Sequence, residues 1–217
     1  MVHIGNYLEK LSLVFIGLCF LCQIGWLIAE KRLLKQQFNS LNITKLKKYF
    51  FSLVFVLVVV FIFSFEVKEI FVSYFAWKMN PLSRLLLPPY QPITYFLIST
   101  SSKLIFPYLI SLFFSLVFLF LASFLNKKSS ESYFYPEEPI ILSLAIFLSG
   151  YPGFLIYLIL FFAIFFIFNL ILTTINLFKE KKLEKISPYF LWLPVAFFAI
   201  ILINWLSQSG YLIWFNL

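Results

Sequence analysis

The stretch F-Y-P-E-E-P-I-I-L-S-L-A-I-F-L-S-G-Y-P-G, residues 134–153, decides how the rest of the chain is interpreted. Two adjacent carboxylates, Glu137 and Glu138, lie between two prolines at the start of an uncharged run of 40 residues, 139–178. A single helix of that length would measure about 60 Å, twice the thickness of the membrane hydrocarbon. The glycines and the proline of 150–153 are strong turn formers, so we expect the run to fold back there.

The composition of the whole chain indicates a membrane protein. Hydrophobic residues make up 62% of the 217 residues, charged residues only 12%, and the mean hydropathy is +0.97. A soluble domain carries about 25% charged residues, so this chain cannot cover its surface with polar side chains, and we expect the lipid bilayer to surround most of it. The net charge of +8 does not favour nucleic acid as a partner, because the basic residues form short runs between apolar segments.

The apolar segments predict one domain, residues 1–217, that is all-α and polytopic, with about six transmembrane helices. These helices are expected at about 11–29, 49–65, 104–126, 139–150, 153–178 and 190–206. Four prolines in the segment 80–103 exclude a continuous helix across it, and we expect this segment at the outer surface or in the interface. Glu66 is expected to mark the exit from the second span, so that no span contains an ionisable residue.

The basic residues predict the orientation of these helices. If 139–178 crosses the membrane twice, 12 of the 17 Lys and Arg residues lie on the cytoplasmic side; with one crossing, only 8 do. The positive-inside rule therefore favours six crossings with both termini outside. We expect the protein to lie in the plasma or inner membrane of the cell.

Other polar residues at membrane depth are expected to have structural roles. Cys19 and Cys22 are spaced C-F-L-C, but an apolar helix stabilises thiolates poorly, so we expect buried, inert thiols rather than a redox or zinc site. The sequence contains no cluster of metal ligands and no nucleotide-binding fingerprint, and we expect neither a metal nor a cofactor. Six residues are expected to form hydrogen bonds between helices, namely Gln23, Asn169, Thr173, Thr174, Asn176 and Asn204.

The two glutamates have a simple structural interpretation. Pro136, Glu137, Glu138 and Pro139 place acidic side chains in the first turn of a helix. The helix dipole stabilises such acids by about 0.3–1 kcal/mol, and proline is common at this position. This interpretation needs no chemistry from either carboxylate.

A chemical interpretation comes from the order of motifs in residues 134–205. Glu138 is followed after eleven residues by G-Y-P-G, then by a long apolar span, a basic loop and I-S-P-Y-F-L-W-L-P (186–194). This order resembles the C-terminal half of prepilin peptidases, which are membrane aspartyl proteases with a G-x-G-D motif. The resemblance implies that Glu138 stands where the family has its second catalytic aspartate and that Glu30 lies near the position of the first. The chain contains no aspartate, and Tyr135-Pro136-Glu137 replaces the glycines of the motif.

We therefore expect a non-enzymatic accessory or assembly subunit that acts by helix packing, with the bilayer and other membrane proteins as partners. One alternative is a divergent prepilin-peptidase-like protein, active or inactive, with Glu30 and Glu138 as its two carboxylates. Another is a small-molecule carrier. The peptidase alternative requires Glu30 and Glu138 to converge at the cytoplasmic membrane face with room for a water molecule, because such a pair shares a proton.

Overall fold

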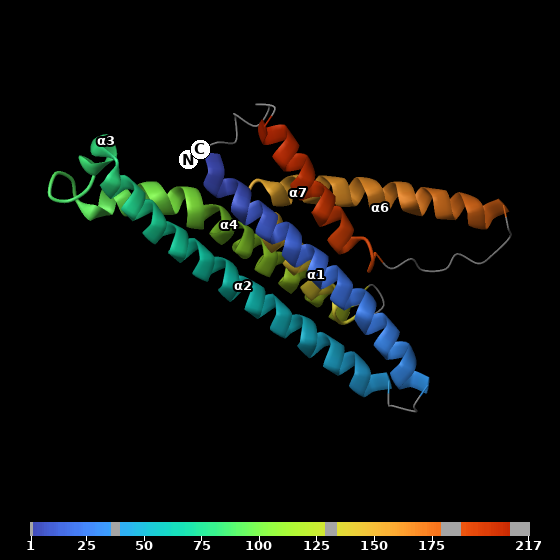
Figure 1. The fold of residues 1–217 in the computed structure, drawn as a ribbon. Coiled ribbons are helices and arrows are strands. Elements are labelled where there is room, and N and C mark those ends of the chain that lie inside the picture. The colour runs from blue at the N-terminus through green and yellow to red at the C-terminus, as the bar shows by residue number, and fades with distance from the viewer. Residues whose placement is uncertain (1, 36–39, 129–133, 179–187, 209–217) are drawn as a thin grey trace.

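The computed structural model of the protein describes residues 2–35, 40–128, 134–178 and 188–208, and its regular secondary structure in these ranges is helical (Figure 1). The helices are α1 (Val2–Lys35), α2 (Ser40–Met79), α3 (Pro81–Arg84), α4 (Ile93–Lys128), α5 (Glu138–Ser149), α6 (Gly153–Phe178) and α7 (Trp192–Gln208). This confirms the predicted all-α class. Four segments are long and apolar enough to cross a membrane, namely Lys10–Glu30, Ile43–Met79, Ile93–Lys128 and Gly153–Ile171.

Helix α5 forms the centre of the molecule. It packs against α1, α2, α4, α6 and α7, and all twelve of its residues are buried. The surrounding helices touch in the order α4, α2, α1, α7, α6, and the rings of Phe114 on α4 and Phe154 on α6 close the circle with centroids 4.8 Å apart. A short helix enclosed in this way satisfies its backbone hydrogen bonds internally and meets protein on every side.

The ends of α5 lie where the sequence predicts them. Pro139 occupies the first turn, and Glu138 is its acidic residue. Gly150 ends the helix with φ 62°, a left-handed conformation that glycine adopts without a Cβ penalty, and α6 begins at Gly153. With twelve residues, α5 is about 18 Å long, too short to cross the hydrocarbon. The predicted span 139–150 is therefore a buried half-length helix.

Helix α2 is much longer than the predicted span 49–65. Its 40 residues run without interruption past Glu66 to Met79, a length of about 60 Å. Glu66 therefore lies inside a continuous helix, directly after the predicted span 49–65 and within the apolar segment Ile43–Met79. This last part of α2 packs against α4, because the rings of Tyr74 and Trp77 both lie edge-on against Phe96 of α4.

The proline-rich connection is shorter than predicted. Pro81 ends α2, and Asn80 adopts an extended conformation in which its side chain accepts a hydrogen bond from the amide of Leu82 (3.0 Å). Helix α4 already begins at Ile93, directly after the last proline of the segment, and continues through Pro107. Only residues 80–92 therefore connect α2 to α4, and 93–103 belong to a long helix. Figure 1 shows α3 at the far end of the α2–α4 pair.

The polar residues at membrane depth divide into two groups. Gln23 forms the predicted bond between elements, donating from Nε2 to the carbonyl oxygen of Tyr189 (2.7 Å). Asn169 and Thr174 instead donate to carbonyls one turn back in α6, at 2.8 Å each, so the prediction of interhelical bonds is wrong for these two. Such back-bonding satisfies a polar side chain on an isolated helix.

The two thiols also differ from expectation. Cys19 is buried but Cys22 is exposed, and both are free. The prediction of two buried thiols is therefore wrong for Cys22, which lies about 60° around α1 from Cys19, just outside the buried stripe of Ser12, Ile16, Cys19 and Gln23. Two predicted features lie outside the described residues, namely the basic loop with Lys179, Lys181, Lys182 and Lys185 and the tail after Gln208.

Candidate functional site

Four charged side chains meet at the end of the bundle where α5 begins. We call Glu30, Lys47, Glu137 and Glu138 the charged cluster; they come from α1, α2 and the start of α5. Glu137 is 1% exposed and Glu138 is 0% exposed. Burying two adjacent acids is costly unless they are paired or hydrogen-bonded, so their partners define what the site can do.

Lys47 joins two of the three acids. Its ammonium contacts Oε1 of Glu137 directly and lies 3.4 Å from Oε2 of Glu30. The same nitrogen lies 4.7 Å from the centroid of the Tyr189 ring. One cation thus links the end of α1, the start of α2 and the start of α5, and cation–π attraction adds the segment before α7.

Tyr189 completes the wall around this ammonium. Burial raises the pKa of its hydroxyl to about 12, although the charge of Lys47 opposes the shift. The residue therefore stays neutral at physiological pH. Its backbone carbonyl accepts the hydrogen bond from Gln23 described above, which ties α1 to the same segment.

Glu138 is held by a different set of donors. Its Oε1 accepts the backbone amide of Tyr135 (3.2 Å), and its Oε2 lies 3.4 Å from the indole nitrogen of Trp192 at the start of α7. The Trp192 ring stacks on Phe161 of α6, with centroids 4.0 Å apart and planes at 10°. Glu138 therefore connects the start of α5 to α7 and, through the indole, to α6.

The segment that leads into the cluster is fixed to α4. Asn126 donates from Nδ2 to the carbonyl of Phe134 and accepts the Phe134 amide at Oδ1, both at 3.0 Å. This reciprocal pair fixes the backbone just before Tyr135. The Asn126 side chain supplies the hydrogen-bond partners that backbone groups near a helix end lack. The charged cluster is thus tied to all five helices around α5.

The structure brings both members of the predicted catalytic pair to the charged cluster. Glu30 reaches the cluster, as the peptidase resemblance requires, although it is far from Glu138 in the sequence. Lys47 links Glu30 with Glu137, and the contacts described for the carboxylate of Glu138 include the amide of Tyr135 and the indole of Trp192. A carboxylate pair of the protease type shares a proton and a water molecule, and here an ammonium lies between the two linked acids.

Sequence reasoning missed Lys47, which it placed among the basic residues of a loop. A signal for it exists in the buried face of α2, where Ile43, Lys47, Phe51 and Val58 recur at helical spacing. A lysine on such a face must find an acid, because an unpaired charge there would be expensive. Continuing the helix back to Ser40 would have placed Lys47 on the buried face of α2.

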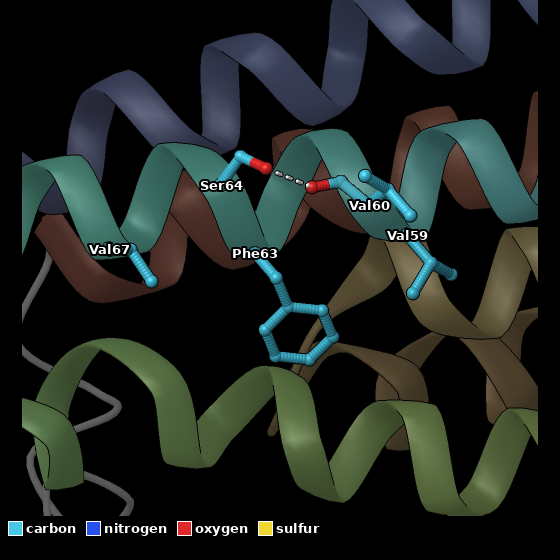
Figure 2. A pocket seen from close by; sticks show the side chains of 5 residues that line it. All are labelled: Val59, Val60, Phe63, Ser64 and Val67. Atoms are coloured by element: carbon cyan, nitrogen blue, oxygen red, sulfur yellow. Dashed lines mark hydrogen bonds between the residues drawn. The ribbon is translucent and has the colours of Figure 1, made fainter.

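A crevice along α2 has no charged side chain in its lining, unlike the charged cluster. This open crevice of about 510 Å³ is lined by Val59, Val60, Phe63, Ser64 and Val67. Figure 2 shows these side chains, with Phe63 extending toward α4. The one polar side chain in the lining, Ser64, donates to the carbonyl of Val60 in its own helix (2.7 Å). Among the described residues, no group of three or more His, Cys, Asp or Glu could hold a metal ion.

No family model, curated protein or solved structure matches this chain. The function is therefore inferred from the charged cluster and from the enclosed helix α5.

The hydrogen bond from Trp192 to Glu138 makes a measurable prediction. Trp192→Phe should keep much of the stacking on Phe161 but remove the indole donor, which would leave Oε2 of the buried Glu138 without this partner. We expect a loss of about 1–2 kcal/mol in the free energy of unfolding, measured by chemical denaturation in detergent micelles. Trp205→Phe, at an exposed position of the same helix, is the control and should change it by less than about 0.5 kcal/mol. Equal effects would show that the indole donor does not matter.

Proposed function

We propose that this protein is a non-enzymatic membrane subunit that acts by helix packing, and that the charged cluster holds its helices together. The observation that carries this proposal is the Lys47 ammonium between the carboxylates of Glu30 and Glu137, beside a helix with no exposed residue. An ammonium neutralises the acids that it joins, whereas a hydrolytic carboxylate pair needs a shared proton, a water molecule and access for substrate.

The outer half of α6 is the surface through which we propose that the subunit binds other membrane proteins. Figure 1 shows α6 extending away from the bundle. The side chains of Phe154, Tyr157 and Phe161 are buried, but 162–171 contains no buried residue. This half of the helix is apolar and has little support from the rest of the described chain, so lipid or another protein must cover it.

The proposed topology follows from the same elements. We propose that the chain enters the membrane from the cytoplasmic side at α5 and returns to that side at the end of α6, with both termini outside, in the plasma or inner membrane. The positive-inside distribution of lysine and arginine supports this orientation.

A divergent prepilin-peptidase-like protein is the second candidate. One observation favours it: Glu30 lies at the same end of the bundle as Glu137 and Glu138, although α2 and α4 separate them in the sequence. In that case Lys47 would have to leave the space between the acids before catalysis. The two candidates differ in whether Glu138 has a chemical role beyond holding α7.

Glu138→Gln separates the two candidates. The amide keeps the size of the carboxylate and an oxygen that can accept a hydrogen bond, but it cannot act as an acid or a base. We expect membranes from cells that produce the wild type or the variant at equal levels to contain the same set of protein N-termini, measured by N-terminal proteomics. Native electrophoresis should show the same complex size for both.

The opposite outcome has an equally clear meaning. A set of cleaved N-termini that depends on Glu138 would establish proteolysis and overturn the non-enzymatic proposal. Glu69→Gln, on the half-buried face of α2 away from the cluster, is the matched control and should leave the N-termini unchanged in either case.

A further inference from the structure

Besides Lys47, helix α2 carries a second buried ionisable residue, Glu66, which lies away from the charged cluster. Its buried face is formed by Ile43, Lys47, Phe51, Val58, Ile62, Glu66 and Ser73, which recur at helical spacing. Glu66 is 0% exposed and lies within the apolar segment Ile43–Met79. Nineteen positions, or about 28 Å of helix, separate it from Lys47, so it belongs to a different layer of the molecule.

Glu66 differs from the other buried acids in its surroundings. Glu137 contacts Lys47, and Glu138 accepts two hydrogen bonds. Neither carboxyl oxygen of Glu66 has a hydrogen-bond partner in the part of the chain that the structure describes. No salt bridge to Glu66 is formed there either.

Contacts of neighbouring rings show which helices enclose Glu66. Phe15 of α1 meets Phe61 of α2 with centroids 5.2 Å apart, so α1 covers one side of this part of α2. Further along, Tyr74 meets Phe96 of α4 at 5.5 Å. Thr100 lies one turn from Phe96 on the same face of α4, and its hydroxyl is likewise buried without a hydrogen-bond partner among the described residues.

The titratable side chains described on the helices around Glu66 provide it with no neutralising charge. Lys10 on α1, Lys68 on α2 and Lys103 on α4 are all exposed, and Glu69 is half-buried. The buried Tyr108 of α4 has its hydroxyl 3.4 Å from the hydroxyl of Ser12 on α1, and both groups are neutral. Among the side chains that the structure describes, the surroundings of Glu66 are therefore apolar or uncharged.

An ionised carboxylate cannot remain in such a place cheaply. Moving an unpaired carboxylate out of water is costly even after the protein relaxes, whereas the neutral acid loses far less. An acidic residue inside a membrane segment is rare for this reason and usually marks a functional site.

We propose that Glu66 is a proton-binding site, a carboxyl group that is protonated in the folded protein at neutral pH. Release of the proton would leave a buried anion among α1, α2 and α4, which favours opening of that interface. Protonation of Glu66 thus couples to the packing of these helices. The proposal is independent of the proposed function, because it involves neither the charged cluster nor α6.

Infrared difference spectroscopy in lipid nanodiscs tests this assignment directly. The spectrum of the wild type minus that of Glu66→Gln at neutral pH should contain the carbonyl stretch of one protonated carboxylic acid. Glu69→Gln is the matched control, and it should not remove that band. If the difference spectrum instead shows the stretches of an ionised carboxylate, Glu66 is charged and the proposal is overturned.

Thermal unfolding gives a second readout that does not depend on the spectral assignment. Glu66 is neutral in the folded protein but ionises in water when the chain unfolds, so unfolding releases a proton and stability falls as the pH rises. From about pH 6 to about pH 9, the melting temperature of the wild type should fall by at least about 3 °C more than that of Glu66→Gln. Parallel melting curves for the two proteins would contradict the proposal.

Discussion

Lys47→Met is expected to lower the free energy of unfolding by about 3–5 kcal/mol, the largest effect of a single substitution that we predict. Methionine fills the space of the lysine stem, but Glu137, 1% exposed, then remains as a buried anion without its counter-ion. Glu30 loses the same partner but is 31% exposed and can turn to solvent. The measurement is the unfolding free energy from chemical denaturation in detergent micelles, or the melting temperature in nanodiscs.

A double substitution shows whether charge or packing causes this loss. Lys47→Met combined with Glu137→Gln removes both charges and should recover more than half of the lost stability, because an apolar or neutral replacement of a buried ion pair is often nearly neutral. Lys48→Met is the matched control at the neighbouring exposed position and should have little effect. If the double variant is as unstable as Lys47→Met alone, the cluster does not act through ionic pairing.

Phe147→Ala is expected to produce the second-largest effect, a loss of about 2–3 kcal/mol. The Phe147 ring is fully buried at the centre of the bundle, with centroids 6.3 Å from Phe55, 6.3 Å from Phe63 and 5.9 Å from Tyr108. Removing a phenylalanine from a water-soluble core costs about 3–5 kcal/mol. We expect less here because lipid is as apolar as the core, so the cavity and the lost ring contacts contribute most of the effect.

The control for this prediction is a phenylalanine that faces away from α5. Phe120 of α4 is 69% exposed, so Phe120→Ala should leave no cavity and should cost less than about 1 kcal/mol under the same conditions. The two variants should be compared by chemical denaturation in the same detergent. Similar losses for both would mean that α5 is not the packed centre of the protein in micelles.

The helices and their breaks could largely be predicted from the sequence, because membrane helices follow from apolar length and from proline and glycine. The predicted helices 139–150 and 153–178 agree to within one residue with α5, which begins at Glu138 and is capped by Gly150, and with α6, which begins at Gly153. The predicted span 49–65 ends where Glu66, Lys68 and Glu69 have the composition of a span exit, and the helix itself extends to Met79. That extension depends on aromatic packing between α2 and α4, which hydropathy does not report.

The candidate site was predicted only in part, for a related reason. Glu30 and Glu138 were chosen for their places in a motif order, and the structure gathers both at one end of the bundle. Lys47, which pairs with two of the acids, belongs to no sequence motif. Its role is visible only in the structure, where Glu137 lies opposite it. Which carboxylate receives a given cation depends on the rotation of α2 and α5 about their axes, which neither spacing nor composition determines.

The enclosure of α5 also has a consequence for how the protein is made. Two of the helices that cover it, α6 and α7, follow it in the chain, so a nascent chain that ends before Trp192 has nothing to cover one side of α5. At about 18 Å, this helix cannot be held across the bilayer by lipid alone. The bundle therefore reaches its final arrangement only after translation has supplied α7, and membrane insertion and folding overlap until the last helix is in place.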